Sequence, residues 1–167
     1  MIWKVFIMKR IITITVALLC IFSLLTLSSC GGKTEQSTSV AKVKSPITLE
    51  KFETVVKSNG FTVEELNSDL NHYIDNKWYR ATMGDVQVWF YMYDTAEHAK
   101  DLATARYENT KSQEGVSSEI GDNYIYTSVI GTGIITTSYQ VDNTETIFKY
   151  SNESVSVVNQ LIAEFGY

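Results

Sequence analysis

Residues 77–94 read KWYRATMGDVQVWFYMYD, two runs rich in β-branched and aromatic residues on either side of Gly84-Asp85. A short turn between two such runs is typical of a β-hairpin. We therefore expect strands at about 77–83 and 86–94, which must be antiparallel because the turn is so tight. Side chains alternate along a strand, so the second run presents one apolar face, the natural partner of packed helices: Val86, Val88, Phe90 and Met92.

Helical patterns precede and follow this hairpin. An apolar stripe at helical spacing predicts a helix near 48–59, capped by Thr48 and stopped at Asn59-Gly60. Thr62-Val63-Glu64-Glu65 resembles a capping box and favours a short helix toward His72, although irregular structure also fits. The remaining pattern predicts a helix at 95–109, a polar loop at 110–122, strands at 123–130, 134–141 and 146–150, and a last helix at 153–165.

Strands grouped in hairpins, rather than alternating strictly with helices, favour an α+β fold. We expect a single antiparallel sheet of four or five strands with the helices packed on one face. Pro46 is the only proline of the 167 residues, and no repeat or low-complexity tract follows it. Residues 46–167 are therefore expected to form a single α+β domain.

The N-terminus has the order of an export signal. Three basic residues precede an apolar run at 11–27, which also approaches the about 20 residues that a bilayer-spanning helix needs. The run ends in Leu27-Ser28-Ser29-Cys30, which resembles the lipobox of bacterial lipoproteins. This resemblance implies that residues 1–29 are a signal peptide, and that Cys30 carries diacylglycerol and anchors the chain on the extracytoplasmic face of the cell membrane. An uncleaved membrane helix is the competing interpretation.

Two further features belong to this region. Met8 opens a shorter version of the same signal, so either Met1 or Met8 is the start. Residues 30–45 are small and polar, which predicts a flexible tether between the lipidated cysteine and the domain.

Charge and cysteine content exclude several functions. Three of the 14 basic residues lie in the signal, so 11 remain against 19 acidic residues, a formal net charge of −8. An acidic surface repels nucleic acid and anionic lipid, so we expect no nucleic-acid partner. The two cysteines are Cys20, inside the signal, and Cys30, so the domain itself has no thiol for a disulfide, a nucleophile or a metal.

Aromatic side chains gather on the second face of strand 86–94. The same alternation places two tyrosines of strand 123–130 on one face, and an arginine of strand 77–83 is close enough to join them. If these side chains share a free face of the sheet, they form a patch suited to a glycan, a peptide or a protein. Aromatic residues are also simply favoured in strands, and a dimer contact is a third interpretation. The candidate ligand-binding residues are Arg80, Trp89, Tyr91, Tyr93, Tyr124 and Tyr126.

Motifs for catalysis or cofactor binding are missing. The two histidines, His72 and His98, are far apart and not at a spacing typical of metal sites, which favours solvated surface positions. Gly131-Thr132-Gly133 lies between strands and is typical of a turn rather than a phosphate loop. An acid pair such as Asp94 with Glu97 would have to face across a cleft to act as a glycosidase does. We expect no cofactor and no metal.

Several segments together resemble small secreted lipoproteins of Gram-positive bacteria, a group whose functions are uncharacterised. The strand VWFYMYD at 88–94 runs into the helix TAEHAKDLATARYENTK at 95–111, NY at 123–124 and VDNT at 141–144 follow, and the chain closes on FGY at 165–167. The resemblance spans roughly 48–167 and implies a fold and a compartment, without assigning any catalytic residue.

We therefore expect a lipid-anchored, extracytoplasmic, non-enzymatic module that binds a ligand or a protein. Two alternatives stay open. One is a cell-envelope hydrolase acting on glycan or peptide, and the other is an accessory subunit of a membrane complex.

Overall fold

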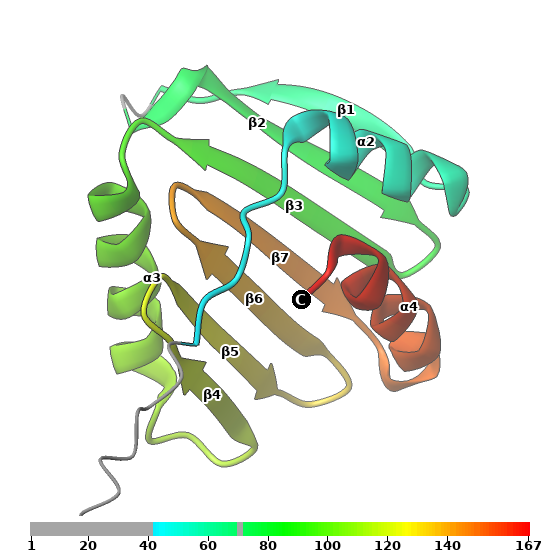
Figure 1. Cartoon of the computed structure of the whole chain (residues 1–167). Helices are drawn as coiled ribbons and strands as arrows, with labels where there is room; N and C mark the ends of the chain where they lie inside the picture. Colours follow the sequence, from blue (N-terminus) through cyan, green and yellow to red (C-terminus); the bar gives the residue numbers. More distant parts are fainter. Residues whose placement is uncertain (1–41, 70–71) are drawn as a thin grey trace, which may run out of the picture. The chain divides into compact units, whose positions relative to one another are not determined.

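The strands of the computed structural model, which describes residues 42–69 and 72–167, form one antiparallel sheet of seven strands (Figure 1). Their spatial order is β1-β2-β3-β7-β6-β5-β4. The hairpin predicted at 77–94 is β2 with β3, and β7 joins it to the later strands by pairing with both β3 and β6. The bounds are β1 (Thr62–Asn67), β2 (Tyr73–Met83), β3 (Val86–Tyr93), β4 (Val116–Ile120), β5 (Tyr124–Ile130), β6 (Ile135–Val141) and β7 (Thr144–Tyr150).

The expectation of four or five strands is wrong, because β1 and β4 were not predicted as strands. β1 occupies the residues expected to be helical, and β4 lies within the loop expected at 110–122. Both are edge strands with one neighbour each, and most of their side chains are exposed. Polar side chains are common on edge strands, where they discourage pairing with other chains. The apolar alternation that marks a strand in a sequence is therefore weak in both.

Three helices accompany the sheet in the described part of the chain: α2 (Leu49–Ser58), α3 (Ala96–Thr110) and α4 (Val155–Phe165). They agree with the helices predicted near 48–59, 95–109 and 153–165. The Thr48 hydroxyl accepts a hydrogen bond from the Lys51 amide, and Thr95 caps α3 in the same way. A short 3₁₀ turn, Asn152–Ser154, leads into α4, which ends at Gly166 with φ of 88°.

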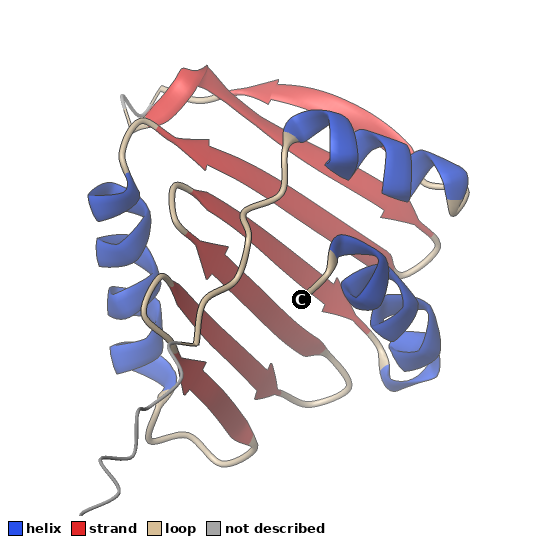
Figure 2. Cartoon of the chain, in the orientation of Figure 1, coloured by secondary structure: helices blue, strands red, loops and turns tan. Residues whose placement is uncertain are grey.

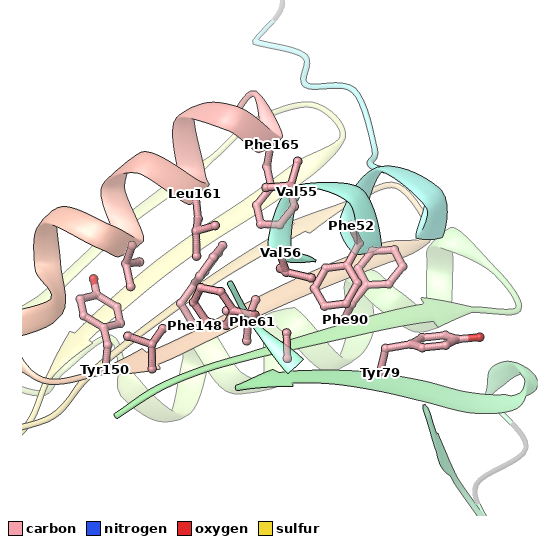
Figure 3. Close-up of a cluster of buried hydrophobic side chains, with 14 of the residues drawn as sticks. Phe52, Val55, Val56, Phe61, Tyr79, Phe90, Phe148, Tyr150, Leu161 and Phe165 are labelled. Carbon is pink, nitrogen blue, oxygen red and sulfur yellow. The ribbon is translucent and has the colours of Figure 1, made fainter. Parts of the chain in front are cut away.

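The main hydrophobic core lies between the sheet and the pair α2 and α4, which cross the same face (Figure 2). Phe52 of α2 stacks on Phe90 of β3, with ring centroids 4.9 Å apart, and packs on Phe165 of α4 at 6.1 Å. Figure 3 shows these rings meeting above the sheet. Val88 and Phe90 belong to this core, so the apolar face of β3 is the one that α2 and α4 cover.

Helix α3 packs on the opposite face, so the expectation that all helices share one face is also wrong. Thr146 of β7 faces the α4 side, where its hydroxyl lies 3.1 Å from that of the C-terminal Tyr167. The adjacent Glu145 must then face the other way, and it binds Arg106 of α3. Only the small side chains Ala99 and Ala103 of α3 are buried, so the sequence carries little signal for the side of the sheet on which this helix packs.

Candidate functional site on the β2 and β3 face

The face of β2 and β3 away from the core carries a group of half-buried aromatic residues. We define the β2–β3 aromatic surface as Tyr73, Trp78, Arg80, Trp89 and Tyr91, each of which is partly exposed. Helix α3 packs mainly on β5 and β6, with fewer contacts to β7 and β3, so it reaches only the β3 side of this surface. The surface is therefore partly accessible to solvent, and the main chains of its residues are fixed by the pairing of β2 with β3.

An irregularity in β2 assembles this surface. Tyr73 pairs with Tyr93 of β3, whereas Trp78, five residues later, pairs with Tyr91, only two residues away on the partner strand. Side chains five residues apart on a regular strand point to opposite faces. Because the irregularity adds residues to β2 between Tyr73 and Trp78, both side chains point to the same face of the sheet.

Two residues with left-handed backbone form the bulge. Asp75 and Asn76 have φ values of 56° and 54°, a conformation that Asn and Asp adopt more readily than most other residues. The main-chain oxygen of Asn76 accepts a 2.7 Å hydrogen bond from the Ser68 amide, just after β1. The bulge is thus tied to the neighbouring strand rather than left as a loose loop.

The rings form a continuous row across the two strands. Tyr91 lies between Trp78 and Tyr73, with ring centroids 5.7 Å and 5.5 Å away and near-parallel planes. Burial raises the pKa of Tyr91 to about 12, so its hydroxyl is a proton donor across the physiological range. Because the rings stack on one another, the row offers mainly ring edges and hydroxyl groups to a ligand.

Trp89 and Arg80 extend the row toward the other end of the hairpin, where they form a cross-strand pair. The Arg80 guanidinium lies 2.6 Å from the carboxylate of Glu64 on β1, which raises the arginine pKa. Among the residues that the structure describes, Trp89 stacks on no other aromatic ring, and its cross-strand neighbours are Arg80 and Ile147.

Tyr93 belongs to a buried polar network beside this surface, next to α3, rather than to the surface itself. Its side chain is 1% exposed, and its hydroxyl donates a 2.8 Å hydrogen bond to Glu145, which is 0% exposed. Arg106 of α3 donates to the other carboxylate oxygen. Burial and the adjacent Glu145 raise the pKa of Tyr93, so it stays protonated. For Arg106, burial would lower the pKa, but Glu145 outweighs it and the pKa is raised.

The two remaining candidates lie on the other face of the sheet. Tyr124 pairs with Val141, and Tyr126 pairs and packs with Tyr139 at 4.9 Å, all on the side of α2 and α4. Three of the six candidates, Arg80, Trp89 and Tyr91, therefore lie together. Alternation within each strand can be read from the sequence, but not which face of β3 matches which face of β5, three places away in the sheet.

Sequence reasoning missed Tyr73 and Trp78. A strand starting at 77 excluded Tyr73. The expected turn at Gly84-Asp85 does pair Trp78 with Tyr91, so the place of Trp78 on this face could have been predicted. The available signal is the dipeptide Asp75-Asn76, which interrupts a run that is otherwise rich in strand-forming residues.

A separate cleft of about 270 Å³ lies between the start of α3 and the β4–β5 turn. Tyr124 lines it, together with polar groups that include Lys100, Glu97 and Asp142. The preceding segment is held beside this turn, because Asn123 donates a 2.8 Å hydrogen bond to the main-chain oxygen of Lys44. Residues 42–45, in which the sequence predicts tether, therefore run along the domain.

The acid pair Asp94 and Glu97 is not arranged across this cleft. The carboxylate of Asp94 accepts hydrogen bonds from the Thr95 amide and from His98, whereas Glu97 lines the 270 Å³ cleft. The two side chains have different surroundings, and nothing in their geometry favours the hydrolase alternative.

No family model matches the chain, and no curated protein matches it. A solved structure of a GTP binding regulator from Thermotoga maritima is similar in part, with 16% identity and a TM-score of 0.45 over 71% of this chain and 84% of that one. A likeness at this level carries no argument about function.

The lipidation candidate Cys30 lies outside the described residues. Within 42–69 and 72–167, no helix has the length and apolar character needed to cross a bilayer.

Proposed function

We propose that this chain is a lipid-anchored, extracytoplasmic binding module that uses the β2–β3 aromatic surface to hold a protein partner through an exposed peptide segment. The observation that carries the proposal is the row of half-buried rings on a face that α3 leaves open. Half-buried Tyr and Trp side chains combine apolar area, low entropy cost on binding and a hydrogen-bonding group, which are the properties of binding hot spots.

The ring geometry favours a peptide over a glycan. A sugar usually stacks on an open aromatic face, but Trp78, Tyr91 and Tyr73 share their faces with one another. Tyrosine hydroxyls at the ring edges suit the amide groups of a peptide, and Arg80 adds a cation that is already paired with Glu64. Trp89, whose ring is unstacked, would supply the apolar anchor of the contact.

The membrane anchor is part of the same proposal. The lipobox-like LSSC at 27–30 supports it, because diacylglycerol on Cys30 would keep the domain beside its partner at the cell surface. A partner that is itself in the membrane would make this chain an accessory subunit, which is a special case of the proposed function rather than a rival to it.

Selection of peptides against the purified chain tests the surface. The full chain in detergent is used to enrich binders from random peptides displayed on phage, and the affinity of the enriched peptide is measured by calorimetry. Trp89→Ala with Tyr91→Ala should weaken binding by about thirtyfold or more, because a single hot-spot side chain contributes about 2 kcal/mol. Tyr107→Ala, at a partly exposed tyrosine of α3, is the matched control. Equal affinity of the double variant and the control would contradict the site.

A further inference from the structure

The two histidines of the chain meet in space although 26 positions separate them. His72 precedes β2 and His98 lies in the first turn of α3, and their ring centroids are 4.8 Å apart. Asp94, which follows β3, completes the group: one ligand atom from each of the three residues lies within 4.8 Å of the other two. We call His72, Asp94 and His98 the His–Asp–His cluster.

The fold fixes all three positions. The Asp94 amide donates a 3.0 Å hydrogen bond to the main-chain oxygen of His72, which extends the β2–β3 pairing by one step. His98 follows four residues after Asp94, and its amide donates to the Thr95 hydroxyl at 3.1 Å. Main-chain contacts therefore hold the backbone of the cluster, while the side chains of His98 and Asp94 are 42% and 40% exposed.

A cavity of about 200 Å³ adjoins the cluster. His72 and His98 line it together with Asp101 and Leu102 from the next turn of α3. It has room for an ion with bound water, and it offers a second carboxylate beside the two imidazoles.

We propose that the His–Asp–His cluster binds a divalent transition-metal ion of the zinc class. Imidazole nitrogen with one carboxylate is a donor set that suits Zn²⁺ and its neighbours and does not suit Ca²⁺ or Mg²⁺, which prefer oxygen alone. With ligand bonds of about 2.0–2.1 Å, two ligand atoms on one tetrahedral zinc ion lie about 3.3–3.4 Å apart. The ligand atoms here lie within 4.8 Å of one another, so the side chains need to close by about 1.5 Å at most.

The hydrogen bond between Asp94 and His98 does not by itself account for the cluster. His98 Nδ1 lies 2.6 Å from Asp94 Oδ1, and this pair would serve equally well to close the first turn of α3. That role does not involve His72, whose ring nevertheless contacts the edge of the His98 ring. Two imidazoles brought together beside a carboxylate and a cavity are accounted for by a shared ion.

Zinc binding to the full chain tests this inference independently of any peptide ligand. The chain is produced with a histidine-free tag, purified in detergent, stripped with a chelator and titrated with zinc chloride in a calorimeter. We expect saturable binding of one ion, no comparable binding of magnesium, and shifts of both histidine side-chain NMR signals on adding zinc. His72→Ala, His98→Ala and Asp94→Asn should each weaken zinc binding by about tenfold or more. Glu97→Gln, in the same turn of α3, should leave it unchanged.

Two results would overturn the proposal: no saturable zinc binding to the intact chain, or equal zinc affinity in His72→Ala. Circular dichroism of each variant without metal separates loss of ligand from loss of fold. Because Asp94→Asn retains an oxygen that can accept the Thr95 and His98 hydrogen bonds, it keeps the test valid if an alanine variant fails to fold.

Discussion

The Tyr93 hydroxyl donates a 2.8 Å hydrogen bond to the carboxylate of Glu145, the cross-strand neighbour of Tyr91, so a buried charge lies directly beside the half-buried aromatic row. Arg106 of α3 neutralises that charge from the other side. Strand β3, strand β7 and helix α3 are thereby joined at one point. We infer that this network holds the base of the β2–β3 aromatic surface rigid.

Removing the arginine should destabilise the fold strongly. Arg106→Met leaves the Glu145 carboxylate buried without a counter-ion, and breaking a buried pair in this way costs about 3 kcal/mol. Chemical unfolding in urea measures the free energy. Adding Glu145→Gln to Arg106→Met should recover part of the loss, because the buried charge is gone. If Arg106→Met alone is no less stable than Tyr107→Ala, the network does not contribute to the stability of the fold.

The bulge in β2 gives a second prediction. Asn76→Val should lower the free energy of unfolding by about 1–2 kcal/mol, because a β-branched residue is strained at a φ of 54°. Asn76→Gly relieves this strain and is the control. The valine variant should also change the near-ultraviolet circular dichroism of the aromatic residues, since the bulge places Tyr73 beside Tyr91. Equal stability of the two variants would contradict the role assigned to the bulge.

Acid stability should depend on Asp85 in the β2–β3 turn. Hydrogen bonds from Ser151 and Ser154 to its carboxylate lower the pKa of Asp85 to about 2, from an ordinary value of 3.8. A lowered pKa means that the ionised form stabilises the fold above the ordinary pKa, and that this contribution is lost as pH falls toward 2.

Asp85→Asn should therefore be less stable than the unchanged chain at neutral pH. The difference in the free energy of unfolding between the two should shrink as the pH is lowered from about 4 to about 2. Unfolding curves at a series of pH values measure it. A difference that stays constant with pH would mean that these hydrogen bonds do not favour the ionised carboxylate.

The anchor makes its own prediction. Cys30→Ala removes the thiol that would receive the lipid, so an uncleaved precursor should accumulate. Gel mobility detects the uncleaved precursor, and labelling with a radioactive fatty acid detects the loss of the lipid. Cys20→Ala is the matched control. Normal maturation of the Cys30 variant would contradict the proposed anchoring.

The sequence predicts the interior of this fold better than its edges. Strands β2, β3, β5, β6 and β7 carry apolar alternation because each has two neighbours and a buried face. At the edges, Val63 and Leu66 are the only large apolar residues of β1, and Val116 and Ile120 the only ones of β4. Their strand conformation comes from main-chain pairing with β2 and β5, which no local pattern reports.

The candidate sites show a related limit. Alternation within β3 places Trp89 and Tyr91 on one face, but matching that face to β5 depends on the register through β7 and β6. The contact between the His72 and His98 rings depends on where the first turn of α3 lies relative to the start of β2. Such long-range geometry has no counterpart in residue spacing, so neither the division of the tyrosines nor the His–Asp–His cluster could be predicted.

The most direct test of the proposed function is photo-crosslinking in cells that produce the full chain, with benzoylphenylalanine in place of Trp89. We expect a discrete adduct with a protein. This adduct should be lost when Tyr91→Ala is added, and it should not form when the photo-reactive residue replaces Tyr107 instead of Trp89. Adducts that form equally from positions 89 and 107, persist in Tyr91→Ala, or consist of glycan would contradict the aromatic surface as the site of a protein partner.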